Sequence, residues 1–84
     1  MRGLMMQVKQ ILDSIGLDMV IYPCEYNERL REYKIKMFNT QSNQSHNIYL
    51  FEDWLQEDPE ALARMIALDF LYMEIESIRG HKNV

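Results

Sequence analysis

The chain has 84 residues, of which 48% are hydrophobic and 26% are charged, and its formal net charge is −4. This composition is typical of one folded domain and excludes a disordered chain. The acidic balance argues against general nucleic-acid binding, because domains with that function are usually basic.

The single cysteine and the start of the chain bear on the cell compartment. Cys24 has no second cysteine with which to form an internal disulfide, so nothing points to an oxidising compartment. Gln7 and Lys9 interrupt the first apolar residues too early for a signal-peptide core. No apolar run approaches the roughly 20 residues of a membrane span. We therefore expect a cytoplasmic protein that has no membrane partner.

The first part of the chain predicts a helix over residues 4–15 and a strand over residues 18–26. Gly16 suits the end of this helix, whose apolar face consists of Leu4, Val8, Ile11, Leu12 and Ile15. Alternation along the strand puts Met19 and Ile21 on one face and, on the other, Val20, Tyr22, Cys24 and Tyr26. Pro23 has no N–H to donate to a neighbouring strand, so it favours an edge strand or a bulge.

Two further strands are predicted over residues 32–38 and 48–51. In the first of them, charged residues alternate with apolar ones, which indicates a half-buried strand with inward Tyr33, Ile35 and Met37. Residues 39–47 are wholly polar, and we expect them to form an exposed, mobile loop. Residues 52–57 are expected to form a short turn that places Trp54 and Leu55 under the sheet.

A long helix is predicted over residues 59–79. Asp58 suits its N-cap, Pro59 its first position, and Gly80 the left-handed residue just past its end. The apolar residues of this helix form two stripes on nearly opposite sides. The first stripe comprises Leu62, Ile66, Phe70 and Met73, and the second comprises Leu68, Leu71, Ile75 and Ile78.

The order helix-strand-strand-strand-helix predicts a small α+β domain. Three consecutive strands favour an antiparallel sheet, packed on one face by the N-terminal helix and the long C-terminal helix. In architecture alone, this order is similar to small secretion-chaperone-like domains and phage-encoded inhibitors.

The second stripe of the long helix leads to a prediction of self-association. If its four side chains stayed in water, each would lose the roughly 1.5–3 kcal/mol of stabilisation that burial provides. A domain of this size is only marginally stable. We expect another copy of the chain to bury the stripe, since two-fold dimers are the commonest oligomers. The alternatives are that a different protein buries the stripe or that the first helix does. The predicted interface consists of Leu68, Leu71, Ile75 and Ile78.

A basic stretch offers nucleic acid as an alternative partner. Its bases are Arg29, Arg31, Lys34 and Lys36. Binding of single strands would also need outward aromatic rings on which bases stack, and the sequence does not fix which of Tyr22, Tyr26 and Tyr49 point outward. The competing interpretation is an edge strand whose lysines prevent pairing with other chains.

An acidic stretch offers a third kind of surface. Five acids and no base lie between residues 52 and 60. They could imitate a row of phosphates and so inhibit a nucleic-acid enzyme, or they could simply complement the dipole of the following helix. The residues are Glu52, Asp53, Glu57, Asp58 and Glu60.

Catalysis and metal binding have little support in the residue types. Cys24, His46 and Asp53 are suitable as nucleophile, base and orienting group, but they stand in no recognisable motif. One cysteine and two distant histidines do not supply four metal ligands. We predict a non-catalytic protein without metal or cofactor, which binds itself and an unidentified protein. An adaptor, chaperone-like or inhibitor role fits, as in phage or bacterial accessory proteins.

Overall fold

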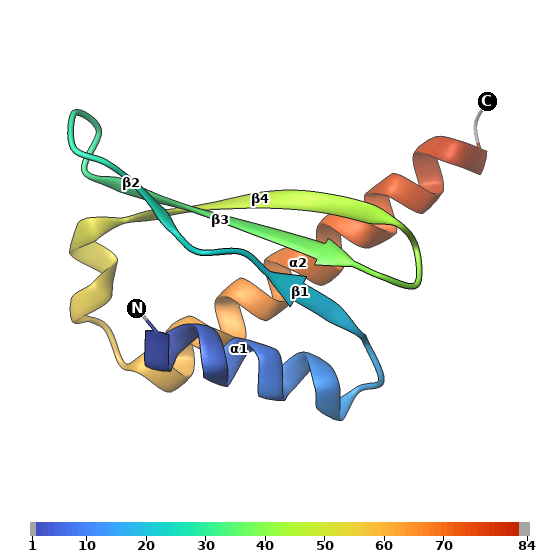
Figure 1. Cartoon of the computed structure of the whole chain (residues 1–84), viewed down its shortest axis with the longest axis horizontal. Helices are drawn as coiled ribbons and strands as arrows, with labels where there is room; N and C mark the ends of the chain where they lie inside the picture. Colours follow the sequence, from blue (N-terminus) through green and yellow to red (C-terminus); the bar gives the residue numbers. More distant parts are fainter. Residues whose placement is uncertain (1, 83–84) are drawn as a thin grey trace.

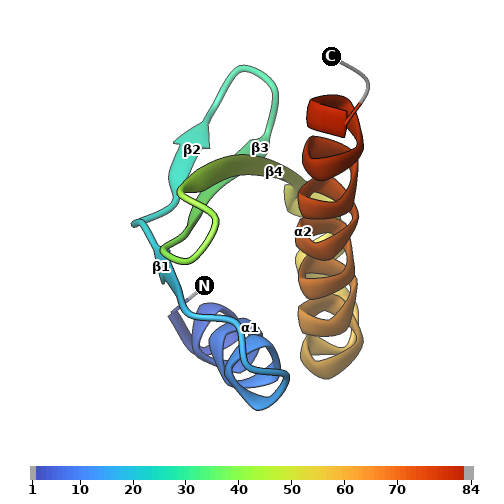
Figure 2. The ribbon, with the colours of Figure 1, turned by 90° about the vertical axis from the view of Figure 1, so that its right-hand side faces the viewer.

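The computed structural model describes residues 2–82, with the side chains of residues 2–79. It contains an N-terminal helix α1 (Arg2–Ser14), a four-stranded antiparallel sheet and a long C-terminal helix α2 (Pro59–Lys82). Both helices lie on one side of the sheet, and neither covers the opposite face (Figure 1, Figure 2). The predicted α+β class is confirmed, with one strand more than expected.

Strand β3 (Glu32–Asn39) is the centre of the sheet. Strand β4 (Gln44–Phe51) pairs with one side of β3 along its whole length. Two short strands, β1 (Met19–Ile21) and β2 (Glu25–Asn27), pair with the other side of β3. The lysines of β3 therefore lie in a central strand, and the interpretation that they protect a sheet edge is wrong.

Pro23 divides the strand predicted over residues 18–26 into β1 and β2. Ile21 is opposite Met37 and Glu25 is opposite Lys34, so three residues on the edge side span two residues of β3. The extra residue makes a bulge. The missing N–H of Pro23 predicts an edge strand or a bulge, and the structure shows both, because β1 and β2 are also at the edge of the sheet.

The bulge changes the face on which the following side chains lie. Tyr26 is opposite the half-buried Tyr33 on the inner face, and Cys24 packs against the core on that face too. Tyr22, before the bulge, lies on the outer face with Val20. The prediction that these residues share one face is wrong, because the extra residue reverses the alternation.

The polar residues 39–47 form a tight hairpin, so the predicted mobile loop is wrong. β3 extends to Asn39, and β4 begins at Gln44 instead of residue 48. The Asn39 Oδ1 accepts hydrogen bonds from the backbone N–H groups of Gln41 (2.9 Å) and Ser42 (3.4 Å). Asn43 adopts a positive φ of 59°. Asparagine suits both roles, so the polar residues build the turn themselves.

Helix α1 ends at Ser14, one residue before its predicted end, so the prediction that Ile15 belongs to its apolar face is wrong. Gly16 follows it with a φ of 84°, a left-handed conformation that glycine adopts without steric cost. Leu4, Val8 and Leu12 are buried, whereas Ile15 lies beyond the helix and is exposed.

Helix α2 begins at Pro59 as predicted but extends beyond its predicted end. The Leu62 N–H donates to the Asp58 carbonyl oxygen at 3.0 Å. At the other end α2 continues through Gly80 to Lys82, so the predicted stop at Gly80 is wrong. Glycine within a helix costs about 1 kcal/mol relative to alanine, which the last turn of a long helix can tolerate. No helix within residues 2–82 has the length and apolar character needed to cross a membrane.

The core lies between the inner face of the sheet and the two helices. It includes the predicted inward residues of β3 and the first stripe of α2. Ile35, Met37, Ile66 and Phe70 are fully buried. Met73 is half-buried against them.

A short 3-10 helix, η1 (Glu52–Gln56), connects β4 to α2. Leu55 packs against the core as predicted. Trp54 is 38% exposed, and its ring packs edge-on against Phe51 with centroids 5.1 Å apart. Neighbouring residues of a 3-10 helix point about 120° apart, so Leu55 faces the sheet and Trp54 does not. The predicted placement of Trp54 under the sheet is wrong.

Candidate functional site

Helix α2 carries exposed apolar side chains on the side opposite the core. Leu68, Ile75 and Ile78 are 64%, 54% and 52% exposed, and Tyr72 is 65% exposed. We call these four residues the outer row of α2. Leu71, the fourth predicted interface residue, is half-buried and packs against the core. Tyr72 was missed, although its spacing of four from Leu68 and three from Ile75 places it on the same helix face.

Helix α1 does not cover the outer row. It contacts α2, and the row nevertheless remains exposed. The fully buried Ile66 and Phe70 lie roughly 160° around the helix from Leu68 at 100° per residue. The alternative in which the first helix buries this whole stripe is therefore wrong.

The two arginines nearest the outer row are paired within the helix. The Arg64 guanidinium lies 2.7 Å from the Glu60 carboxylate, four residues earlier. The Arg79 guanidinium lies 3.5 Å from the Glu76 carboxylate, three residues earlier. The apolar row is therefore flanked at both ends by charges that are already compensated.

The outer face of the sheet presents aromatic rings beside lysines. Tyr22, Tyr49 and Phe51 are 43%, 51% and 49% exposed. The Lys36 ammonium lies 5.3 Å from the centre of the Tyr22 ring, and Lys34 is opposite Tyr49. Tyr22 and Tyr49 are thus outward, whereas Tyr26 lies on the inner face.

The four predicted basic residues all lie on the β2–β3 hairpin. Lys34 and Lys36 are on the outer face of β3, and Arg29 and Arg31 are in the turn between β2 and β3. Lys34 is not alone, because its ammonium lies 3.1 Å from the carboxylate of Glu25. The hairpin therefore carries mixed charge with a basic excess.

The five predicted acidic residues are all exposed, at the junction of η1 and α2. They do not form one uniform row. Glu60 pairs with Arg64, and Glu52 lies near Tyr26. Partial desolvation, followed by this Glu52 carboxylate, raises the pKa of Tyr26 above its ordinary value.

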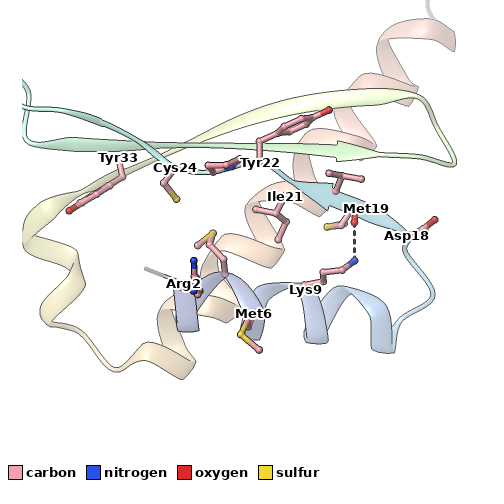
Figure 3. Close-up of a pocket in the computed structure, with 12 residues that line it drawn as sticks. Arg2, Met6, Lys9, Asp18, Met19, Ile21, Tyr22, Cys24 and Tyr33 are labelled. Carbon is pink, nitrogen blue, oxygen red and sulfur yellow. Dashed lines mark hydrogen bonds between the residues drawn. The ribbon is translucent and has the colours of Figure 1, made fainter.

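An apolar cavity of about 870 Å³ lies between α1 and the β1–β2 edge. Its walls include Met6, Met19, Ile21 and Cys24. Figure 3 shows Ile21 and Cys24 pointing toward α1 and Tyr22 pointing away from it. Burial raises the pKa of the Cys24 thiol above its ordinary value.

The structure does not bring the predicted thiol and base together. Cys24 belongs to the β1–β2 edge, and His46 is in β4 on the far side of β3. Strands lie about 4.8 Å apart, so two strand spacings, roughly 10 Å, separate the two positions. Asp53 is exposed in η1.

His46 belongs to a buried cluster that the sequence did not reveal. Its side chain is 13% exposed, and its Nε2 lies 3.2 Å from Oε1 of Glu74, which is 9% exposed. The His46 ring also packs edge-on against Phe70. The prediction that His46 is a loop surface residue is wrong, because β4 begins before it.

Within the described residues, no three His, Cys, Asp or Glu side chains gather closely enough to hold a metal ion. No protein-family model, curated protein or solved structure matches the chain.

Proposed function

We propose that this chain is a non-catalytic binding protein that forms a homodimer through the outer row of α2. In this proposal the dimer then binds a protein partner, as an adaptor, chaperone-like protein or inhibitor in the cytoplasm. The single observation that carries the proposal is the exposure of Leu68, Ile75 and Ile78.

Burial of the outer row would stabilise the protein. Each exposed aliphatic side chain gains about 1.5–3 kcal/mol when it is removed from water. A single core in a domain this small leaves little stability to spare. Contiguous exposed apolar residues of this kind commonly mark protein interfaces.

The charges at the two ends of the outer row are compatible with a second copy of the chain as the partner. In a two-fold dimer the same patch meets itself, so an uncompensated charge would face its own copy and repel it. The arginines that flank the outer row are neutralised by Glu60 and Glu76. The row can therefore meet itself without repulsion between these arginines, and the exposed Asp69 beside Leu68 adds a negative charge at the edge of the row.

Paired substitutions test this proposal. Leu68→Glu with Ile75→Glu places four carboxylates in the proposed interface, so we expect a monomer by light scattering and an unchanged circular dichroism spectrum. Leu71 is left intact because it contributes to the core.

A matched control uses two other exposed apolar residues. Ile15 and Leu30 are each 56% exposed and lie outside α2, so Ile15→Glu with Leu30→Glu makes the same change in charge and size. This variant should remain dimeric. Loss of the dimer in both variants, or in neither, would count against the outer row as the interface.

A further inference from the structure

We infer that the outer face of the sheet binds a single-stranded nucleic acid. Bases would stack on Tyr22, Tyr49 and Phe51, and phosphates would lie beside Lys34 and Lys36. This surface is on the side of the sheet away from both helices (Figure 2), so the inference does not rest on self-association through α2.

Three aromatic rings are exposed on the outer face of the sheet. The solvent-facing side of an antiparallel sheet is usually polar, yet Tyr22, Tyr49 and Phe51 are all more than 40% exposed there. Tyr49 and Phe51 are two residues apart on one strand, about 7 Å. Tyr22 is opposite Lys36, which is opposite Asn47, so two strand spacings and a two-residue offset place Tyr22 about 12 Å from Tyr49. Exposed rings at such spacings can each receive the face of one unpaired base.

Two lysines lie beside these aromatic rings. The Lys36 ammonium stands over the Tyr22 ring, so a base that stacks on this ring must displace the ammonium, which can then pair with a phosphate of the same strand. Lys34 pairs with Glu25, and their side chains are 39% and 73% exposed. Surface ion pairs contribute little net stability, so Lys34 can exchange the carboxylate for a phosphate at small cost.

The hairpin turn extends this surface. Phe51 is opposite Glu32, which directly follows the turn that holds Arg29 and Arg31. Basic residues therefore occur beside Tyr22, beside Tyr49 and next to the Phe51 end. The acidic residues between them and the net charge of −4 predict weak, salt-sensitive binding with little preference for sequence.

The geometry favours single strands over duplexes. A duplex keeps its bases stacked on each other, so the rings of a sheet face cannot reach them without unpairing. Neither α1 nor α2 lies on this face to enter a major groove. If this face instead binds a protein, the chain should not bind oligonucleotides.

Fluorescence anisotropy tests the inference. The probes are a labelled oligothymidylate of about ten nucleotides, an abasic strand of equal length and the corresponding duplex. At low salt we expect binding to oligothymidylate and clearly weaker binding to the other two. With about three phosphate contacts, log Kd should rise with log salt with a slope near 2.

Variants locate the binding surface. Tyr22→Leu and Tyr49→Leu each remove a stacking ring but keep an apolar side chain, and should weaken oligothymidylate binding by about 5- to 150-fold. Tyr72→Leu on α2 is the matched control and should bind like the wild type. Lys36→Gln should reduce the salt slope by about 0.7. If one sheet variant fails to fold by circular dichroism, the other carries the test.

Three results would overturn the inference. One is no binding of oligothymidylate at low salt, and another is equal binding of the abasic strand or duplex. The third is equal weakening by Tyr72→Leu and the sheet variants, which would place the contact elsewhere.

Discussion

One buried carboxylate joins the long helix to the β3–β4 hairpin. Glu74 is buried; its Oε1 accepts a hydrogen bond from Ser42 Oγ at 3.2 Å and lies 3.2 Å from His46 Nε2. A buried polar group is tolerated when it has a hydrogen-bond partner, and Ser42 provides one here. In the sequence, Glu74 reads as one more polar residue between two apolar stripes, because its partners come from a distant hairpin.

Removing this carboxylate should be costly. Glu74→Ala removes the acceptor of the Ser42 Oγ hydrogen bond and the carboxylate beside His46 Nε2, and we expect it to lower the free energy of unfolding by about 1–3 kcal/mol in urea denaturation. The control is Glu76→Ala, which removes an exposed carboxylate on the same helix. This variant should change the free energy of unfolding by less than about 1 kcal/mol. If Glu74→Ala and Glu76→Ala lowered the free energy of unfolding equally, the buried contacts of Glu74 would contribute no specific stability.

The Cys24 thiol should react slowly. Burial raises its pKa, so at a given pH the folded chain contains less thiolate, the reactive form, than the unfolded chain. Iodoacetamide labelling followed by mass spectrometry should be slower without urea than with it. Folding raises the pKa of the Cys24 thiol, so the protonated thiol favours the folded state. This contribution to the free energy of unfolding is present below the pKa of the unfolded chain and is lost as pH rises through the pKa of the folded chain. Labelling as fast in the native protein as in urea would contradict this account.

At the scale of elements, the bulge at Pro23 decides which side chains enter the core. Tyr22 pairs with β3 through its N–H, which donates to the Lys36 carbonyl oxygen, and pairing resumes at Glu25. Cys24 therefore faces α1, while Tyr22 remains outside. Without this register, the cavity and the outer aromatic face would have different linings.

Deletion of Pro23 tests this register. Removing it leaves two residues opposite two residues of β3, so β1 and β2 should merge, with Cys24 and Tyr26 still on the inner face. We expect a folded protein with at least wild-type stability and greater hydrogen-exchange protection at Cys24. The control deletion, of Val20, moves the buried Met19 to the outer face and should be strongly destabilising. An unfolded Pro23 deletion would contradict the assigned register.

Local sequence signals predicted the helices and strands better than they predicted which strands pair with each other. Gly16, Pro59 and the alternation of Tyr33, Ile35 and Met37 depend on nearby residues, and the structure follows them. The polar hairpin was missed because Asn39 and Asn43 act through specific backbone geometry that composition does not show. The four-residue spacing of Tyr72 from Leu68 was available in the sequence. The central position of β3, however, depends on pairing across the chain.

At the scale of the whole molecule, the domain has two separate exposed apolar surfaces. The outer row of α2 is aliphatic and flanked by compensated charges, which suits a second copy of the chain. The outer sheet face combines aromatic rings with lysines, which suits a ligand with flat rings and negative charge. A dimer through α2 would carry two such sheet faces and so offer two sites for one strand.

The most direct test of the central claim, self-association through α2, is the mass of the wild-type protein by sedimentation equilibrium. The proposal predicts twice the 10.1 kDa of the chain across the micromolar range, with dissociation only on dilution. A single species of monomer mass at high micromolar concentration would contradict it.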